Sequence, residues 1–478
     1  MTTIKKFSKQ FSLLLAAILT CGAMISSCTV DDNPAGPSPV EPTSSIDELV
    51  DNIDVKVISQ DVITAEKLAE EAFGKNNLLT ANPTLLELRR RYMKRQTEMT
   101  EKLTNGRANG LATGFVSCKF TYQSVDENGE PIALSARVYW GVYWFFGQHV
   151  LDPDYIVLCP HFTIASNAEC PTECHTYEAI ALVGDNLLIM PDYEGYGASK
   201  DRTHPYINHH LLATQSYDAL KAGYRVFRDY SGAKLEDDWK LYVAGCSQGG
   251  GNALAIHREL ESAPATAKDW RFAYSYCCAG PYDPALTFNT YFEQKKHPYP
   301  VVFPLTIKSL LASFPDVLGK WKEDDFYSED YINNLKPEID RMISSKNYNA
   351  DQINAAFFKK YPHTGEGGID GGDEIMISDI LNPALFDKNS EIRKAMFECL
   401  DRRELNLTKD LSLSAPWQHS HLIKLYHGKA DDIVPYANSE AVVNTFPNYT
   451  EMFNSEWGTD GHISTCLKWL CTLAINNW

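Results

Sequence analysis

The stretch that decides the fold is LYVAGCSQGGGNALAIHREL, residues 241–260. It begins with an apolar, strand-like segment, passes through a glycine-rich turn and continues with a helical pattern. Residues 245–249 fit G-x-S-x-G, a pattern that requires a sharp strand-to-helix turn with glycines on both sides of a strained nucleophile. Small residues continue to position 255, so the helix can pack closely on a sheet. We therefore predict that Ser247 is a nucleophile; the alternative is a small polar residue in a crowded turn.

An acid suited to such a serine follows a later strand-like run. A serine hydroxyl needs a base to take its proton, and that base needs an orienting acid. The expected chain order is serine, acid, histidine, each on a turn after a strand. The segment HGKADDIVP, residues 427–435, follows the strand-like run LIKLY and puts Asp431 in the acid position. The alternative is that these acids cap a helix near Pro435, a role that suits the neighbouring Asp432.

His462 is the predicted base. It lies 31 residues after Asp431, beside Gly461 and just before a helical pattern, so a tight loop can bring its ring to Ser247. The alternative is a lone surface histidine. Three other histidines precede the acid and break the expected order: His419, His421 and His427.

The rest of the chain alternates between strand and helix patterns. Residues 115–144 are predicted to form a hairpin, and apolar runs at residues 155–163, 186–197, 239–245 and 272–280 are separated by helical stretches. This alternation is typical of an α/β protein with a largely parallel sheet covered on both faces. We expect an N-terminal helical arm over residues 46–110, a core over residues 111–283 and 418–478, and a helical insertion over residues 284–417.

These residues resemble those of the secretory lipase family of α/β-hydrolases, which includes the fungal lipase A type. The resemblance rests on the ordered motifs SVDENGEPIALSARVY, VLCPHFT, MPDYEGYGAS, HPYI, GCSQGG, HGKADDIVP and DGH, and covers roughly Gly114 to the C-terminus. It implies an α/β-hydrolase fold, a catalytic triad of Ser247, Asp431 and His462, and a lid formed by the insertion. No cofactor and no metal ion are expected.

An oxyanion hole needs backbone donors. Gln248, directly after the nucleophile and at the start of a helix, supplies one N–H group. The resemblance carries the second to Thr163, although many relatives have His-Gly-Thr where this chain has His161-Phe162-Thr163. The bulky Phe162 is expected to change the shape of the pocket. His161 and two residues of the PDYEGYG loop complete the expected pocket: Asp192, for which a structural turn role is favoured over a catalytic one, and Tyr193.

The N-terminus is a targeting segment. Three lysines precede a short apolar run, and Ile25-Ser26-Ser27 before Cys28 resembles a bacterial lipobox. We expect residues 1–27 to be a lipoprotein signal peptide, Cys28 to be lipidated and residues 28–45 to be a flexible tether. The chain would then be an exported bacterial lipoprotein of the outer membrane, periplasm or cell surface, attached to the membrane by its lipid anchor only. The alternative is simple cleavage to a soluble exported form.

Charge and cysteine content limit the kinds of partner, metal site and disulfide that we expect. The net charge of -18 disfavours nucleic acid. Ten of the 12 cysteines follow Cys28; several lie in apolar runs typical of buried thiols, and their disulfide pairing cannot be deduced from the sequence. CPTECH, residues 170–175, favours a local disulfide or structural role over zinc binding, and GIDGGDE, residues 368–374, favours a polar loop over calcium binding. We expect a monomer.

The predicted function is exported serine ester hydrolysis. The substrate would be a small-molecule, lipid-linked or polysaccharide-linked ester with an acyl or aromatic group, cleaved through an acyl-enzyme. Two alternatives remain: a serine peptidase of the same fold, and a non-catalytic surface lipoprotein that binds ligands in a retained hydrolase pocket.

Overall fold

The computed structural model describes residues 46–74, 83–104, 112–144, 148–262, 264–368, 372–409, 421–453 and 460–474. These residues all lie in one of the two units of the chain, Ser44–Trp478. The expected signal peptide, Cys28 and tether fall outside the described residues. Within the described ranges, no helix has the length and apolar character needed to cross a membrane.

A ten-stranded sheet forms the centre of the described chain, in the order β1-β2-β3-β6-β5-β7-β8-β12-β13, with β4 paired to β3. Six strands of this sheet run parallel to one another: β6, β5, β7, β8, β12 and β13. The strands β1 to β4 pair antiparallel, and β3 joins β6 antiparallel. Their bounds are β1 Val55–Thr64, β2 Ala112–Val125, β3 Pro131–Trp144, β4 Gln148–Val150, β5 Tyr155–Leu158, β6 Leu187–Pro191, β7 Lys240–Cys246, β8 Phe272–Cys278, β12 Leu422–Tyr426 and β13 Thr450–Met452.

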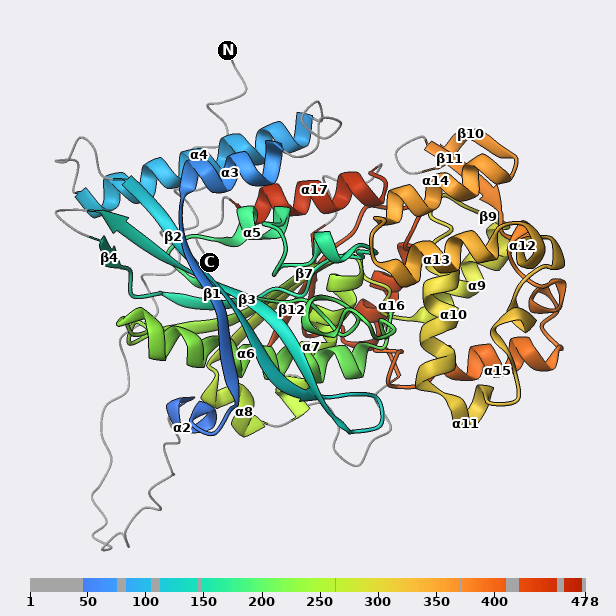
Figure 1. Ribbon diagram of the computed structural model, residues 1–478, viewed down its shortest axis with the longest axis horizontal. Coiled ribbons are helices and arrows are strands. Elements are labelled where there is room, and N and C mark those ends of the chain that lie inside the picture. Colours follow the sequence, from blue (N-terminus) through green and yellow to red (C-terminus); the bar gives the residue numbers. More distant parts are fainter. Residues whose placement is uncertain are drawn as a thin grey trace, which may run out of the picture. The chain divides into compact units, whose positions relative to one another are not determined.

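Helices cover both faces of this sheet (Figure 1). One face carries α6 His209–Ser231 and α7 Gln248–Ser262, and the other carries α3 Ala65–Gly74, α4 Pro83–Thr104, α5 Tyr177–Leu182 and α17 His462–Leu473. The shorter α2 Ile46–Val50, α8 Pro264–Asp269 and α16 Ala437–Thr445 complete this part. Every residue of β5 and β6 is buried, as expected for central strands of a parallel sheet with two covered faces.

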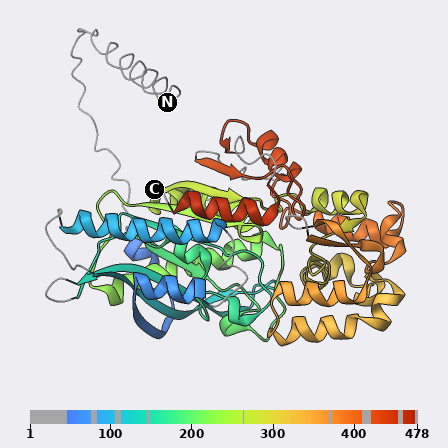
Figure 2. The same ribbon diagram turned by 90° about the horizontal axis from the view of Figure 1, so that it is seen from above.

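The insertion between β8 and β12 has a hydrophobic core of its own. In the turned view of Figure 2 its yellow and orange elements group at the right of the picture. Its helices are α9 Pro284–Gln294, α10 Val302–Ser313, α11 Pro315–Leu318, α12 Glu329–Asn334, α13 Lys336–Ser345, α14 Ala350–Lys360 and α15 Glu391–Leu400. A small sheet accompanies them, in the order β10 His363–Gly368, β11 Gly372–Met376 and β9 Lys296–His297. The helical character expected from the sequence is therefore present, and the small sheet is an addition.

The expectation of an entirely helical N-terminal arm was wrong at one point. Val55–Thr64 forms the edge strand β1, antiparallel to β2, with Val62 opposite Val116. Six of its ten residues are β-branched valine, isoleucine or threonine, which favour a pleated, half-buried surface over a helix. The segments of α3 and α4 that follow are helical, as their periodicity predicted, and both helices pack on the sheet.

Candidate active site

Ser247 occupies the sharp turn between β7 and α7. Its φ of 58° lies in the left-handed region, which a residue with a side chain adopts only at a cost of roughly 1–2 kcal/mol. The flanking glycines make the turn possible, because a Cβ on Gly245 would lie 2.1 Å from the carbonyl oxygen of Gly249, and one on Gly249 would lie 2.3 Å from that of Pro160. The backbone N–H of Ser247 donates to Cys278 O at 2.8 Å and ties the turn to β8. Ser247 therefore sits in the strained elbow that its motif predicted.

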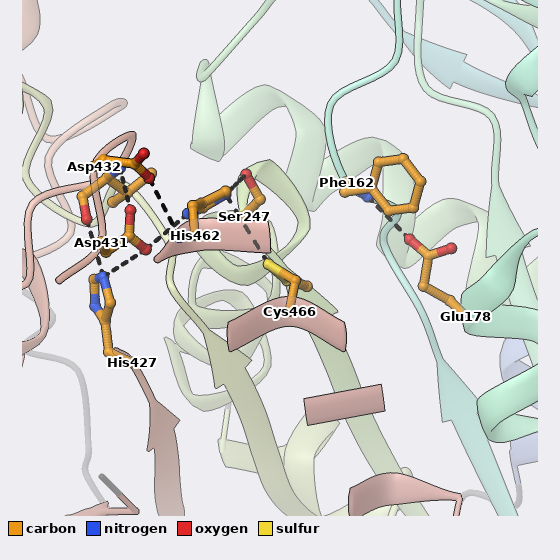
Figure 3. Close-up of a disulfide and its surroundings, with 10 residues drawn as sticks. Phe162, Glu178, Ser247, His427, Asp431, Asp432, His462 and Cys466 are labelled. Carbon is orange, nitrogen blue, oxygen red and sulfur yellow. Dashed lines mark hydrogen bonds and ion pairs between the residues drawn. A yellow bond between two sulfur atoms is a disulfide. The ribbon is translucent and has the colours of Figure 1, made fainter. Parts of the chain in front are cut away.

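The structure brings Ser247, His462 and Asp431 together from three segments, as predicted from the sequence (Figure 3). Ser247 Oγ lies 2.8 Å from His462 Nε2, and His462 Nδ1 lies 2.7 Å from Asp431 Oδ2. Ser247 follows β7, Asp431 lies in the loop after β12, and His462 is the first residue of α17. The side chains of His462 and Asp431 are 4% and 0% exposed. These three groups form a continuous hydrogen-bonded chain that runs from the half-buried Ser247 to the fully buried Asp431.

Asp431 is held as an anion. Burial alone would raise its pKa, but the charges and hydrogen bonds of His462 and His427 outweigh burial and hold the pKa of Asp431 well below its usual range. Its other oxygen, Oδ1, accepts backbone N–H groups of Ile433 at 3.0 Å and Val434 at 2.8 Å. Such a fixed carboxylate can orient His462 and stabilise its protonated form.

The neighbouring acid has a different partner. Asp432 Oδ1 accepts the backbone N–H of His462 at 3.4 Å and so contacts the start of α17. Capping of a helix near Pro435, the alternative considered for Asp432, is not what the structure shows, because α16 begins at Ala437 and its preceding residue, Tyr436, makes no side-chain cap. Of the two adjacent acids, Asp431 contacts the ring of His462, whereas Asp432 contacts its backbone.

His427 is a site residue that the chain-order argument set aside. Its Nε2 lies 3.1 Å from Asp431 Oδ2, and its Nδ1 lies 2.8 Å from Ser439 Oγ. The side chain is completely buried behind Asp431. His427 therefore supports the acid and does not compete with His462. The signal in the sequence was its place at the end of a strand, four residues before Asp431.

The two expected oxyanion donors line the same cavity as Ser247. Among the described residues, no group accepts a hydrogen bond from the backbone N–H of Thr163 or of Gln248. By contrast, the N–H of Phe162 donates to Glu178 Oε1 at 3.2 Å (Figure 3). A backbone donor that lines the cavity and has no partner is available for a substrate oxygen. Glu178, which holds the loop before Thr163, was not anticipated from the sequence.

The cavity beside Ser247 has a volume of about 260 Å³ and is bounded by both the core and the insertion. Phe162 lines it, as expected. Six aromatic side chains line it together with aliphatic ones: Phe162, Tyr177, Tyr206, Phe288, Tyr291 and Tyr299. Elements of the insertion close part of the site, and Tyr291 of α9 donates to the carbonyl oxygen of Ile433 at 2.6 Å, two residues after Asp431.

The other three residues expected in the pocket do not line the cavity. His161, Asp192 and Tyr193 are buried and are not among the residues that line the cavity. The carboxylate of Asp192 accepts hydrogen bonds from Ser135 Oγ at 2.6 Å and from the backbone N–H of Thr172 at 2.8 Å. Tyr193 donates to the carbonyl oxygen of His161 at 2.9 Å. These residues serve the loops that carry the site, as the favoured structural role of Asp192 predicted.

A disulfide joins the nucleophile turn to the histidine helix. Cys246 and Cys466 are bonded, with Cα atoms 6.0 Å apart and a sequence separation of 220 residues. Cys246 directly precedes Ser247, and Cys466 lies one helical turn after His462. The local disulfide considered for CPTECH is not formed: Cys170 Sγ contacts Thr172 Oγ1, and Cys174 Sγ donates to Glu169 O at 3.3 Å. The disulfide restrains the two halves of the site where their side chains meet.

No family model and no curated protein sequence matches the chain. Solved structures do. The rice cell wall degrading esterase LipA of Xanthomonas oryzae is 14% identical, with a TM-score of 0.60 over 88% of this chain and 96% of that one. A Legionella pneumophila protein assigned as a hydrolase is 19% identical, with a TM-score of 0.59 over 88% and 95%. Lipase A of Candida antarctica in its closed state is 12% identical, with a TM-score of 0.51 over 93% and 89%. The described chain therefore has the α/β-hydrolase fold, in a form shared with known esterases and lipases.

Proposed function

We propose that the chain is a serine carboxylic ester hydrolase. The observation that carries this proposal is the hydrogen-bonded chain from Ser247 through His462 to Asp431, placed at a strained turn beside a cavity. A serine in this position gains nucleophilicity from the histidine, and the histidine from the buried carboxylate. The likeness in fold to esterases and lipases supports the same reaction class.

The reaction would proceed in two acyl-transfer steps. His462 Nε2 takes the Ser247 proton as Oγ attacks the ester carbonyl, and the N–H groups of Thr163 and Gln248 bind the oxygen on which negative charge develops. The same histidine then gives its proton to the departing alcohol. Water attacks the acyl-enzyme with His462 again as base, and the acid product leaves while Ser247 regains its proton.

The aromatic wall supports acyl or aromatic esters as substrates. Rings and aliphatic side chains from the core and from the insertion surround the cavity, and they match an apolar acyl or aryl group. The insertion would act as a lid, because α9 and α10 contribute wall residues above the serine. Such a lid would enclose the apolar part of the ester beside the serine and still admit the water that hydrolyses the acyl-enzyme.

A covalent probe and a substrate panel test this function. A fluorophosphonate should label the wild-type chain at Ser247, as located by peptide mass spectrometry, and p-nitrophenyl esters should be cleaved at far higher kcat/KM than aminoacyl p-nitroanilides. Higher kcat/KM for the amides would favour the serine peptidase alternative. Absence of both labelling and turnover would favour a non-catalytic ligand-binding lipoprotein.

We further propose that the enzyme acts as an exported lipoprotein attached through Cys28. The lysines, the short apolar run and the lipobox-like residues before Cys28 support this location. Replacement of Cys28 by serine should move the enzyme from the membrane fraction to the soluble fraction and abolish incorporation of radiolabelled palmitate. Unchanged membrane association with no lipid on the wild-type chain would contradict the proposal.

A further inference from the structure

We propose that Glu178 is a specificity-determining residue, whose carboxyl group accepts a hydrogen bond from a hydroxyl or ammonium group on the ester substrate. This inference rests on the proposed ester hydrolase function and adds a polar group to the substrate. It predicts that the group of the natural ester that occupies the cavity, acyl or alcohol, is not a plain hydrocarbon but carries a hydrogen-bond donor.

Glu178 lies inside the active-site cavity. It is the second residue of α5, its exposed fraction is 0%, and it lines the same cavity as Ser247 and His462. Figure 3 shows its side chain reaching the backbone of Phe162, directly before the expected oxyanion donor Thr163. A group bound by Glu178 would therefore belong to the same substrate molecule whose carbonyl is attacked.

One carboxylate oxygen of Glu178 has no hydrogen-bond partner among the described residues. Oε1 accepts the N–H of Phe162 at 3.2 Å, whereas Oε2 is buried and has no hydrogen-bond partner among the described residues. A carboxylate can accept about four hydrogen bonds, and a buried oxygen without any costs roughly 1–3 kcal/mol. A purely structural role in holding the Phe162 loop explains Oε1 but not Oε2.

A second orphaned oxygen belongs to a cavity residue of the insertion. Thr306 Oγ1, on α10 of the insertion, is buried, lines the cavity and likewise has no partner within the described chain. Polar atoms are normally satisfied when they are buried. Two unsatisfied oxygens, one from the core and one from the insertion, indicate that the cavity is built to receive a polar group.

The charges around the cavity favour a substrate that carries a hydrogen-bond donor over one that carries an anionic group. The carboxyl groups of Glu169, Glu178 and Asp351 line it, and no lysine or arginine is among its described lining residues. Burial raises the pKa of Glu178, and no cation opposes this rise. A substrate carboxylate or phosphate would be repelled, whereas a hydroxyl can bind either form of Glu178 and an ammonium can bind the ionised form.

The nearby Glu169 provides a matched control. Its Oε2 accepts the backbone N–H groups of Ala165 at 3.3 Å and Ser166 at 3.1 Å, so its hydrogen bonds are made within the protein. It lines the same cavity and is half-buried. Glu169→Gln therefore removes an acid from the wall without removing an orphaned acceptor.

The experiment compares kcat/KM for two series of matched esters. In the first, p-nitrophenyl 3-phenylpropanoate carries hydrogen, methyl, hydroxyl or aminomethyl at ring position 3 or 4, and the methyl compounds control for size. In the second, the same substituents lie on the phenol of phenyl butyrate, and released butyrate is titrated. We expect at least one hydroxyl or aminomethyl ester to exceed its methyl counterpart by about tenfold or more, the usual effect of a hydrogen bond to a charged group.

Glu178→Gln tests whether Glu178 causes that preference. Glutamine can keep an oxygen for the N–H of Phe162 but places an NH₂ donor where the orphaned acceptor was. The variant should reduce the donor-to-methyl ratio of kcat/KM to about one, whereas Glu169→Gln should leave that ratio at the wild-type value. A role confined to folding would change the melting temperature or all esters equally, and would leave the ratio intact.

The possible results distinguish failure of the proposed role of Glu178 from failure of the proposed ester hydrolase function. Equal kcat/KM for donor and methyl esters in both series would overturn the role of Glu178, even if the variant failed to fold, while the esterase function would stand. A preference that survives Glu178→Gln would overturn it as well. Failure of the wild type to cleave any ester would instead refute the proposed function.

Discussion

Replacement of Ser247 by alanine should lower kcat for ester hydrolysis by about 10⁶-fold, the loss seen when the nucleophile of a serine hydrolase triad is removed. The remaining rate would come from binding and from the oxyanion donors alone. Alanine tolerates the φ of 58° no worse than serine does, so the fold should survive. The measurement is the initial rate on a p-nitrophenyl ester, together with a melting curve for the purified variant.

Ser262→Ala is the matched control for this experiment. Ser262 lies at the far end of α7, is exposed, and donates only to the carbonyl oxygen of Arg258 at 2.7 Å. Its replacement should leave kcat at the wild-type value. A Ser247→Ala variant that kept a tenth or more of wild-type kcat would contradict the assignment of Ser247 as nucleophile.

Asp431→Asn should cost about 10⁴-fold in kcat, as expected for an orienting acid replaced by its amide. The amide would no longer stabilise the protonated ring of His462, and it could hold the ring in the wrong tautomer. It would also face His427 at 3.1 Å without a negative charge. Because the pKa of Asp431 is held below its ordinary value, this group stays ionised from weakly acid to alkaline pH, and its loss should lower kcat across that whole range.

The adjacent acid separates a catalytic effect from a general loss of charge. Asp432 contacts only the backbone N–H of His462 among the site groups described, so Asp432→Asn should reduce kcat by less than tenfold. Profiles of kcat against pH for both variants provide the comparison. If Asp432→Asn were as damaging as Asp431→Asn, the division of roles between the two acids would be wrong.

Much of the site was predictable because each member lies at the end of a recognisable local pattern. Ser247, Asp431 and the strands before them could be placed from apolar runs followed by turn residues, and His462 from its position before an amphipathic helix. Carboxyl ends of parallel strands meet at one edge of a sheet, so the order of the motifs was enough to bring these side chains together.

Features that depend on contacts across the fold were not accessible in this way. His427 has the same local setting whether it acts as a base or supports Asp431, and only the packed loop decides. Local periodicity also does not show whether the side chain of a loop residue reaches the cavity. His161 and Asp192 were therefore predicted to line the cavity, but both are buried and do not line it. The strand β1 was not predicted, because the segments on both sides of it have helical patterns and the whole arm was therefore expected to be helical.

The Cys246–Cys466 disulfide also determines what a single cut in the chain would do. Every residue of the insertion lies between these two cysteines, so a protease that cleaves the insertion once leaves one fragment with Ser247 and another with His462, still covalently joined. The nicked enzyme would migrate as one species until a reductant separated its halves. A chain built in this way can be cut within its insertion while its nucleophile and its base stay covalently joined.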